Sequence, residues 1–419
     1  MFRTLLLAAL ALVCTASAQR LSPLAPVPDW SDLEPYQDTI TREEFTRLLD
    51  TNYAPLQAAA GLIDIGNDAA TIRKNLLPGD TFTLRFAKDD AHAKAAPRYW
   101  RASPAGTDPA HPLAGMKIAI DPGHLGGDWA KMEERWFRIG DTLPITEGDM
   151  TLRVAQLLAP QLTALGAGVT LVRSAPGPTT PDRPENLRDA ARADLILNGA
   201  TDPPDTYTDP DDPQRGQTVQ FRSELLFFRI AEIRHRALLV NTRIQPDIVL
   251  CLHFDADAWG DPATPSFTPN NGLHAIINGT YSPGELRNDD VRHDMLLKLL
   301  TRTADTELAA STTLIHTLAR RLALPPHIYT RDIARRPGPS PYVWARNLLA
   351  NRLYRCPVLF LEPYAMNNRE VWQRIQAGDY EGRREIAGSL RPSIYREYAD
   401  AVAEGIRATF TRGESDRTH

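Results

Sequence analysis

The chain has 419 residues, of which 42% are hydrophobic and 24% are charged, so it can bury a large core and hold more than one domain. The formal net charge of −5 argues against nucleic-acid binding, and we expect no nucleic-acid partner. The 34 prolines gather in connecting segments, where they separate the predicted elements.

The first 18 residues have the pattern of a secretory signal peptide. Arg3 precedes an apolar run from Leu5 to Val13, and the small residues Ala16-Ser17-Ala18 form a cleavage site. The run is far shorter than the roughly 20 apolar residues that a membrane span needs, and no later segment reaches that length. We therefore expect an exported protein, periplasmic or extracellular, without a membrane span.

Two cysteines remain after removal of such a signal peptide. Cys251 and Cys356 both lie in or beside apolar, strand-like runs. We expect two buried thiols, with a single disulfide between them as the alternative in an oxidising compartment.

Residues 19–110 are predicted to form a small N-terminal α+β module. A helix begins with a capping-box pattern at 41–49, and a second helix is predicted at 69–77. Residues 81–86 alternate like a strand, with 98–102 as the predicted partner strand. This module is either a binding module or a support that packs on the main domain.

The main domain is predicted to span residues 111–412, followed by a polar tail at 413–419. Buried strands are predicted at 118–120, 169–172, 247–252, 273–277 and 358–361, and helices at 147–165, 224–243, 291–303, 306–323 and 394–410. Pro160 is expected to kink or shorten the first of these helices. The alternation of strands and helices predicts an α/β fold with three layers, in which helices cover both faces of a mostly parallel sheet.

Two stretches of the main domain have no clear periodicity. Residues 128–145 form a Trp-rich connector, and residues 174–223 are expected to be irregular. Within the second stretch, 201–213 contains five aspartates and four prolines and is predicted to be a solvated loop, because it lacks the ligand spacing and the glycine of a calcium loop. Residues 182–197 look like an alternative middle strand, but no histidine follows them.

Three of the predicted strands run into a side chain that can bind a metal or move a proton: His124, His253 and Glu362. The carboxyl ends of parallel strands meet at one edge of a sheet, and Glu147 joins them if its helix begins at that edge. Two imidazoles and a carboxylate, with a fourth position left for water, form the ligand set of a catalytic zinc site. Glu362 then offers the second carboxylate, which moves the proton from the attacking water to a leaving amine.

Each of these residues also has an ordinary structural explanation. His253 fits a core histidine, Glu362 fits an ion-pair partner of an arginine, and Glu147 fits a favourable charge in the first turn of a helix. Four such coincidences at equivalent positions of the chain are improbable together, and the set therefore favours a functional site.

The order of these motifs resembles a known family. The segments are DPGH, a glutamate that opens the helix in TEGDMTLRVAQLLAPQL, the strand that runs into histidine in PDIVLCLHFDA, and PVLFLEPYAMNN. Together they resemble the zinc-dependent N-acetylmuramoyl-L-alanine amidases of the amidase-3 type over residues 113–411.

This resemblance implies Zn²⁺ as cofactor, zinc ligands at His124, Glu147 and His253, and a catalytic Glu362. It also implies cleavage of the amide bond between N-acetylmuramic acid and L-alanine, with peptidoglycan or muropeptides as partners. It does not identify a protein activator.

The chain departs from the family pattern at three places. The usual HxNA motif is replaced by HFDA at 253–256. The connector before Glu147 is longer than usual and leaves Glu133 and Glu134 as less favoured candidates for the carboxylate ligand. Residues 174–223 form an unusual insertion. Two alternative functions stay open at this point. One is a zinc carboxypeptidase or peptidase that acts on another peptide, and the other is a catalytically silent peptidoglycan-binding protein.

Overall fold

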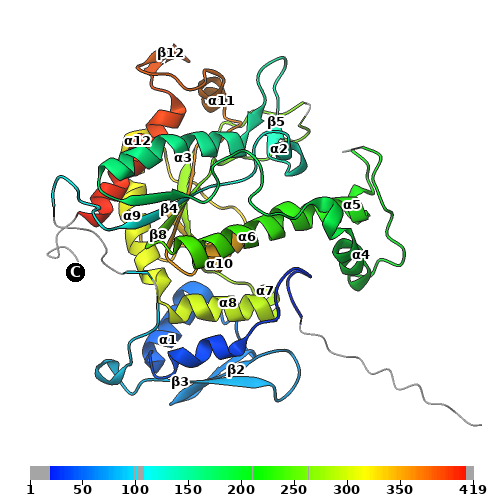
Figure 1. Ribbon diagram of the computed structural model, residues 1–419, viewed down its shortest axis with the longest axis vertical. Coiled ribbons are helices and arrows are strands. Elements are labelled where there is room, and N and C mark those ends of the chain that lie inside the picture. The colour runs from blue at the N-terminus through cyan, green and yellow to red at the C-terminus, as the bar shows by residue number, and fades with distance from the viewer. Residues whose placement is uncertain (1–18, 99, 102–107, 210, 263, 412–419) are drawn as a thin grey trace, which may run out of the picture.

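The computed structural model describes residues 19–98, 100–101, 108–209, 211–262 and 264–411 (Figure 1). The predicted signal peptide at 1–18 and the polar tail at 413–419 lie outside the described residues. Within the described ranges, every helix is too short or too polar to cross a bilayer.

The elements follow one another in an α/β order. The helices are α1 (Arg42–Leu48), α2 (Trp129–Met132), α3 (Glu147–Ala164), α4 (Arg188–Leu197), α5 (Val219–Leu225), α6 (Glu232–Leu239), α7 (Pro283–Leu286), α8 (Asp289–Leu300), α9 (Thr303–Leu322), α10 (Leu349–Leu353), α11 (Arg369–Gln376) and α12 (Ile394–Phe410). The strands are β1 (Ile63–Ile65), β2 (Ala69–Arg73), β3 (Thr81–Arg85), β4 (Lys117–Pro122), β5 (Trp136–Phe137), β6 (Ile145–Thr146), β7 (Gly168–Leu171), β8 (Ile248–Leu252), β9 (Leu273–Ile277), β10 (Val343–Ala345), β11 (Val358–Pro363), β12 (Arg384–Ile386) and β13 (Ser389–Arg391).

The described residues form a six-stranded central sheet in the order β10-β9-β11-β8-β4-β7. β11, β8, β4 and β7 run parallel to one another, whereas β9 pairs antiparallel with β11 and parallel with β10. The mostly parallel α/β fold is therefore confirmed, with one edge of the sheet running in the opposite direction.

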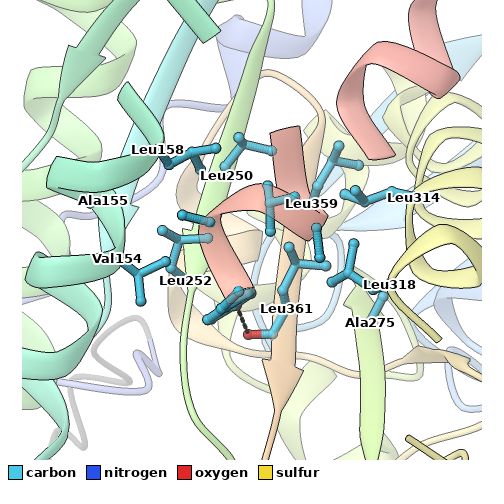
Figure 2. Packing of buried hydrophobic residues seen from close by; sticks show 14 of the residues in the cluster. Val154, Ala155, Leu158, Leu250, Leu252, Ala275, Leu314, Leu318, Leu359 and Leu361 are labelled. Carbon is cyan, nitrogen blue, oxygen red and sulfur yellow. Dashed lines mark hydrogen bonds between the residues drawn. The ribbon is translucent and has the colours of Figure 1, made fainter. Parts of the chain in front are cut away.

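Helices cover both faces of this sheet (Figure 1). Successive side chains of a strand point to opposite faces. In β8, Ile248, Leu250 and Leu252 pack in the cluster with α3, α9 and α12, whereas Val249 and Cys251 pack in the cluster that contains the end of α6. Figure 2 shows the side chains of α3 and α9 meeting those of β8 and β11 in the first cluster. The three predicted layers are thus present.

Several predicted elements differ from the structure. The helix α3 continues through Pro160 to Ala164, so the proline does not shorten it. Residues 174–223 are only partly irregular, because they contain α4 and the start of α5, and 182–197 is largely helical. As predicted, Cys251 and Cys356 are buried thiols that are not joined in a disulfide.

The N-terminal region forms a three-stranded antiparallel sheet in the order β1-β2-β3. The prediction of a helix at 69–77 is wrong, because Ala70 and Ile72 alternate with exposed residues and pair on both sides as the central strand β2. β3 pairs with β2. The partner strand predicted at 98–102 includes residues 99 and 102, which lie outside the described residues.

This small sheet shares its core with a helix from much later in the chain. Phe45 of α1 and Ile72 of β2 lie in one buried cluster with Met295 and Leu299 of α8. Figure 1 shows α1, β2 and β3 lying against α8 on the side away from α12. The N-terminal residues therefore pack on the main domain through α8, and the boundary at residue 110 stays a prediction.

A buried ion-pair network holds the loop after β4. The Arg236 guanidinium of α6 pairs with Asp121 at 2.9 Å and with Glu232 at 2.7 Å. It also donates hydrogen bonds to the carbonyl oxygens of Pro122, at 2.8 Å, and His124, at 3.1 Å. One side chain thus compensates two buried carboxylates and fixes the backbone that leads to His124.

Replacing Arg236 by methionine should lower the free energy of unfolding by about 3–5 kcal/mol, because a buried ion pair loses one partner. The measurement is chemical denaturation followed by circular dichroism. Arg243→Met, at an exposed position of the same helical run, is the control and should leave the midpoint nearly unchanged. Equal midpoints for Arg236→Met and the original protein would contradict the role of this network.

Candidate metal centre

The four predicted site residues meet at one edge of the central sheet. His124 follows β4 by two residues, His253 directly follows β8, Glu362 lies in β11, and Glu147 is the first residue of α3. They converge because β4, β8 and β11 run parallel and their carboxyl ends lie side by side. The structure thus brings together all four residues, and their chemical roles stay predictions.

Glycines allow the backbone to pass close to these side chains. A Cβ atom on Gly123 would lie 2.2 Å from the ring of His253, and one on Gly148 would lie 2.2 Å from the backbone carbonyl of Leu125. His124 itself adopts a left-handed backbone with φ of 61°. Such conformations are costly for residues other than glycine and gather at functional sites.

The carboxylate of Glu147 lies between the two imidazoles. Its Oε2 atom is 3.3 Å from Nε2 of His124, and its Oε1 atom is 3.3 Å from Nδ1 of His253. The donor atoms of the three residues all lie within 4.8 Å of one another. Two ligands of a tetrahedral zinc ion at bond lengths of about 2.0–2.1 Å are about 3.3 Å apart, so this donor set fits a zinc ion.

The charge state of Glu147 also suits a metal ligand. The residue is 1% exposed, and burial alone would raise the pKa of its carboxyl group. The charges of His124 and Arg135 and a hydrogen bond from His253 outweigh burial and hold the pKa at about 2. The buried group is therefore an anion, which is the form that binds a metal ion, and Arg135 lies 3.8 Å from it.

Glu133 contacts the other side of the His124 ring. Its Oε1 atom lies 2.7 Å from Nδ1 of His124, and its Oε2 atom accepts a hydrogen bond from the Leu125 amide at 2.6 Å. The sequence suggested Glu133 and Glu134 as rival ligands. Here Glu133 instead orients the ring and leaves Nε2 toward Glu147, as carboxylates do for metal-bound histidines. Glu134 points away and pairs with Arg215 at 2.9 Å.

Glu362 lies beside this group in a partly buried position. In the antiparallel ladder of β11 and β9, Glu362 lies directly opposite His274. Burial raises the pKa of Glu362 well above its usual value, and the negative charges of Glu147 and Asp255 add to this effect. A carboxyl group with a raised pKa can both take up and release a proton near neutral pH.

One cavity of about 1070 Å³ opens in front of these residues. His124, Glu147 and Glu362 line it together with the cationic side chains of Arg135 and Arg346. The cavity therefore gives a bound molecule access to the imidazole–carboxylate group and to Glu362 at once.

The cavity also contains three residues that sequence reasoning did not single out as functional: Asp255, His274 and His327. Asp255 was visible as part of the altered HFDA motif, and His274 as a histidine inside the apolar strand LHAII. His327 lies in a loop of mixed composition, where no local pattern marks it.

Comparisons with known proteins give matches among solved structures alone. No protein-family model and no curated protein matches the chain. Ami1 from Mycobacterium abscessus, an N-acetylmuramyl-L-alanine amidase in its apo form, matches with a TM-score of 0.37 and 17% identity over 71% of this chain and 99% of its own.

Two further solved structures match to a similar extent. The CwlD amidase from Clostridioides difficile, in complex with the GerS lipoprotein, matches with a TM-score of 0.36 and 12% identity over 70% of this chain and 95% of its own. The N-acetylmuramoyl-L-alanine amidase AmiC2 of Nostoc punctiforme matches with a TM-score of 0.36 and 15% identity over 71% of this chain and 98% of its own.

Replacing Glu133 by glutamine should weaken divalent-metal binding about 10–100-fold, because the amide cannot accept from both the His124 ring and the Leu125 amide. Competition with a chromophoric chelator measures this affinity. Glu134→Gln is the matched control, since that carboxylate pairs with Arg215 instead. Equal affinities for the two variants would show that the contact of Glu133 with His124 does not support a metal ligand.

Proposed function

We propose that this protein is an exported, zinc-dependent N-acetylmuramoyl-L-alanine amidase that cleaves the amide bond between N-acetylmuramic acid and L-alanine of peptidoglycan. The observation that carries this proposal is the buried Glu147 carboxylate held at 3.3 Å from both His124 and His253. Glu362 lines the same cavity, and the ordered motifs around all four residues resemble the amidase-3 family.

His124, Glu147 and His253 would hold the zinc ion, because two imidazoles and a carboxylate leave a fourth position open for water or substrate. The chemistry that bound zinc supplies is Lewis acidity, which activates the attacking water and polarises the scissile carbonyl group. Glu133 keeps the His124 ring in place through its contact at Nδ1.

Glu362 would move the proton. Its carboxylate takes a proton from the attacking water and gives it to the amine of L-alanine as the amide bond breaks. The raised pKa of Glu362, caused by burial and by nearby carboxylates, suits a group that both accepts and returns a proton. Arg135 and Arg346 offer positive charge in the cavity to carboxylates of the peptide.

The proposed location is outside the cytoplasm, where peptidoglycan lies. The signal-peptide pattern of residues 1–18 supports export. A protein activator is not part of the proposal.

Purified protein incubated with sacculi should release intact stem peptides with a new L-alanine amine, and a chelator should abolish the release. A carboxypeptidase would release single amino acids, and a silent binding protein would release nothing.

The double variant His124→Ala/His253→Ala should lose its activity and should bind about one zinc ion per chain fewer than the original protein. Unchanged zinc content in this double variant would overturn the assignment of the ligands.

Glu362→Gln separates proton transfer from metal binding. The amide keeps the shape of the side chain but cannot accept the proton, so the rate should fall at least about 10²–10⁴-fold while zinc content stays at the original level. Glu147→Gln should instead lose zinc, because a neutral amide is a poor ligand, and excess zinc should restore part of its activity. Rescue of Glu362→Gln by zinc would mean that the two roles have to be exchanged.

A further inference from the structure

A second group of metal-binding side chains lines the same cavity. Asp255, His274 and His327 each offer one donor atom, and these atoms lie within 4.8 Å of one another. The donor types repeat those of the first group, with two imidazoles and one carboxylate. The group therefore meets the same chemical requirement for a transition-metal ion.

The edge of the central sheet holds all three residues in place. His274 is the second residue of β9, the amide of Asp255 donates to the carbonyl oxygen of Pro363 at 3.1 Å, and the amide of His327 donates to that of Leu273 at 3.0 Å. Donors on a rigid frame keep their geometry without reorganisation when an ion binds.

The contacts within the group resemble those around Glu147. Nδ1 of His327 lies 3.0 Å from Oδ2 of Asp255, and the His274 and His327 rings stack with their centroids 4.4 Å apart. An ion pair between His327 and Asp255 would explain the first contact alone. It does not explain why a second imidazole is buried against that pair.

His274 supplies the observation that points to a ligand. The residue is 2% exposed, and its Nε2 atom lies 3.1 Å from the hydroxyl group of Tyr329. Its Nδ1 atom is buried and has no hydrogen-bond partner among the described residues. Leaving a buried polar atom without a partner destabilises a protein, so such atoms are rare unless a ligand uses them. In the tautomer that carries its proton on Nε2, the ring donates to Tyr329 and Nδ1 keeps a lone pair for a metal ion.

The charges in the cavity also favour a second cation. Glu147, Asp255 and Glu362 place three carboxyl groups along it, beside Arg135 and Arg346. Asp255 gives a cation in this group one anionic ligand beside the two imidazoles.

We propose that Asp255, His274 and His327 form a second site for a divalent first-row cation, in the same cavity as the first site. Three protein ligands leave an open coordination position, as in catalytic zinc sites. Tyr329 is a positioning residue, because its hydroxyl group orients the His274 ring.

The experiment measures metal content and does not depend on the proposed amidase activity. Purified protein is stripped with chelator, equilibrated with Zn²⁺, desalted and analysed by mass spectrometry for zinc. We expect about two equivalents per chain for the original protein, and about one each for Asp255→Asn, His327→Ala and His124→Ala. His111→Ala is the control and should keep about two, since its pairing with Asp108, also at 3.0 Å, lies on the exposed surface.

Combining His124→Ala with His327→Ala should leave almost no zinc. A single equivalent in the original protein, or a second equivalent that survives Asp255→Asn and His327→Ala, would overturn the second site. Loss of one equivalent in Asp255→Asn but none in His124→Ala would leave the second site standing and remove the first.

Tyr329→Phe tests the site without changing a ligand. Chelator competition should show binding of the second zinc ion weakened about 10–100-fold, with the first unchanged. The control is Tyr342→Phe, whose hydroxyl group donates to the carbonyl oxygen of Leu324 at 3.2 Å outside this group. If Tyr329→Phe and Tyr342→Phe bind the second ion equally well, Tyr329 does not position a metal ligand.

Discussion

A charged group that folding removes from water has to be paired with an opposite charge. This constraint fixes the arrangement of the side chains at the sheet edge where β4, β8 and β11 end. Glu147 is 1% exposed, and two imidazoles and Arg135 surround its carboxylate. Leaving such a charge without a partner costs several kcal/mol. The start of α3 and the turns after β4 and β8 therefore cannot shift independently, because each contributes one side of a single electrostatic group.

The same constraint extends to the layer behind the site. Arg236 compensates Asp121 and Glu232 and donates to the carbonyl oxygen of His124, while Glu133 contacts the His124 ring. Backbone and ring of one histidine are thus held by different charged groups. The proposed metal site requires such close positioning of its ligands.

The reversed direction of β9 gives the cavity its second set of donors. If β9 ran parallel to β11, its amino-terminal residue His274 would lie at the far end of the sheet from Glu362. Because β9 is antiparallel, His274 pairs with Glu362, and the loop that carries His327 packs beside it. A single antiparallel pairing thus joins a second imidazole–carboxylate group to the first, and Glu362 adjoins both.

The sequence alone predicted the apolar strands β4, β8 and β11 and the polar residues that follow or end them. It could do so because the length of a strand, its apolar composition and the turn residues that end it are properties of neighbouring residues. The boundaries of α12, predicted at 394–410 and observed at Ile394–Phe410, belong to the same class. The helix prediction at 69–77 was wrong because a segment this short takes its conformation from the strands that pair with it on both sides.

Tertiary structure alone decided that Glu133 contacts His124, that β9 runs antiparallel, and that His327 comes to Asp255 from 72 positions further along the chain. The physical reason is the same in each case. Contacts with residues distant in sequence determine the partner of a carboxylate and the direction of a strand, and no local pattern encodes those contacts.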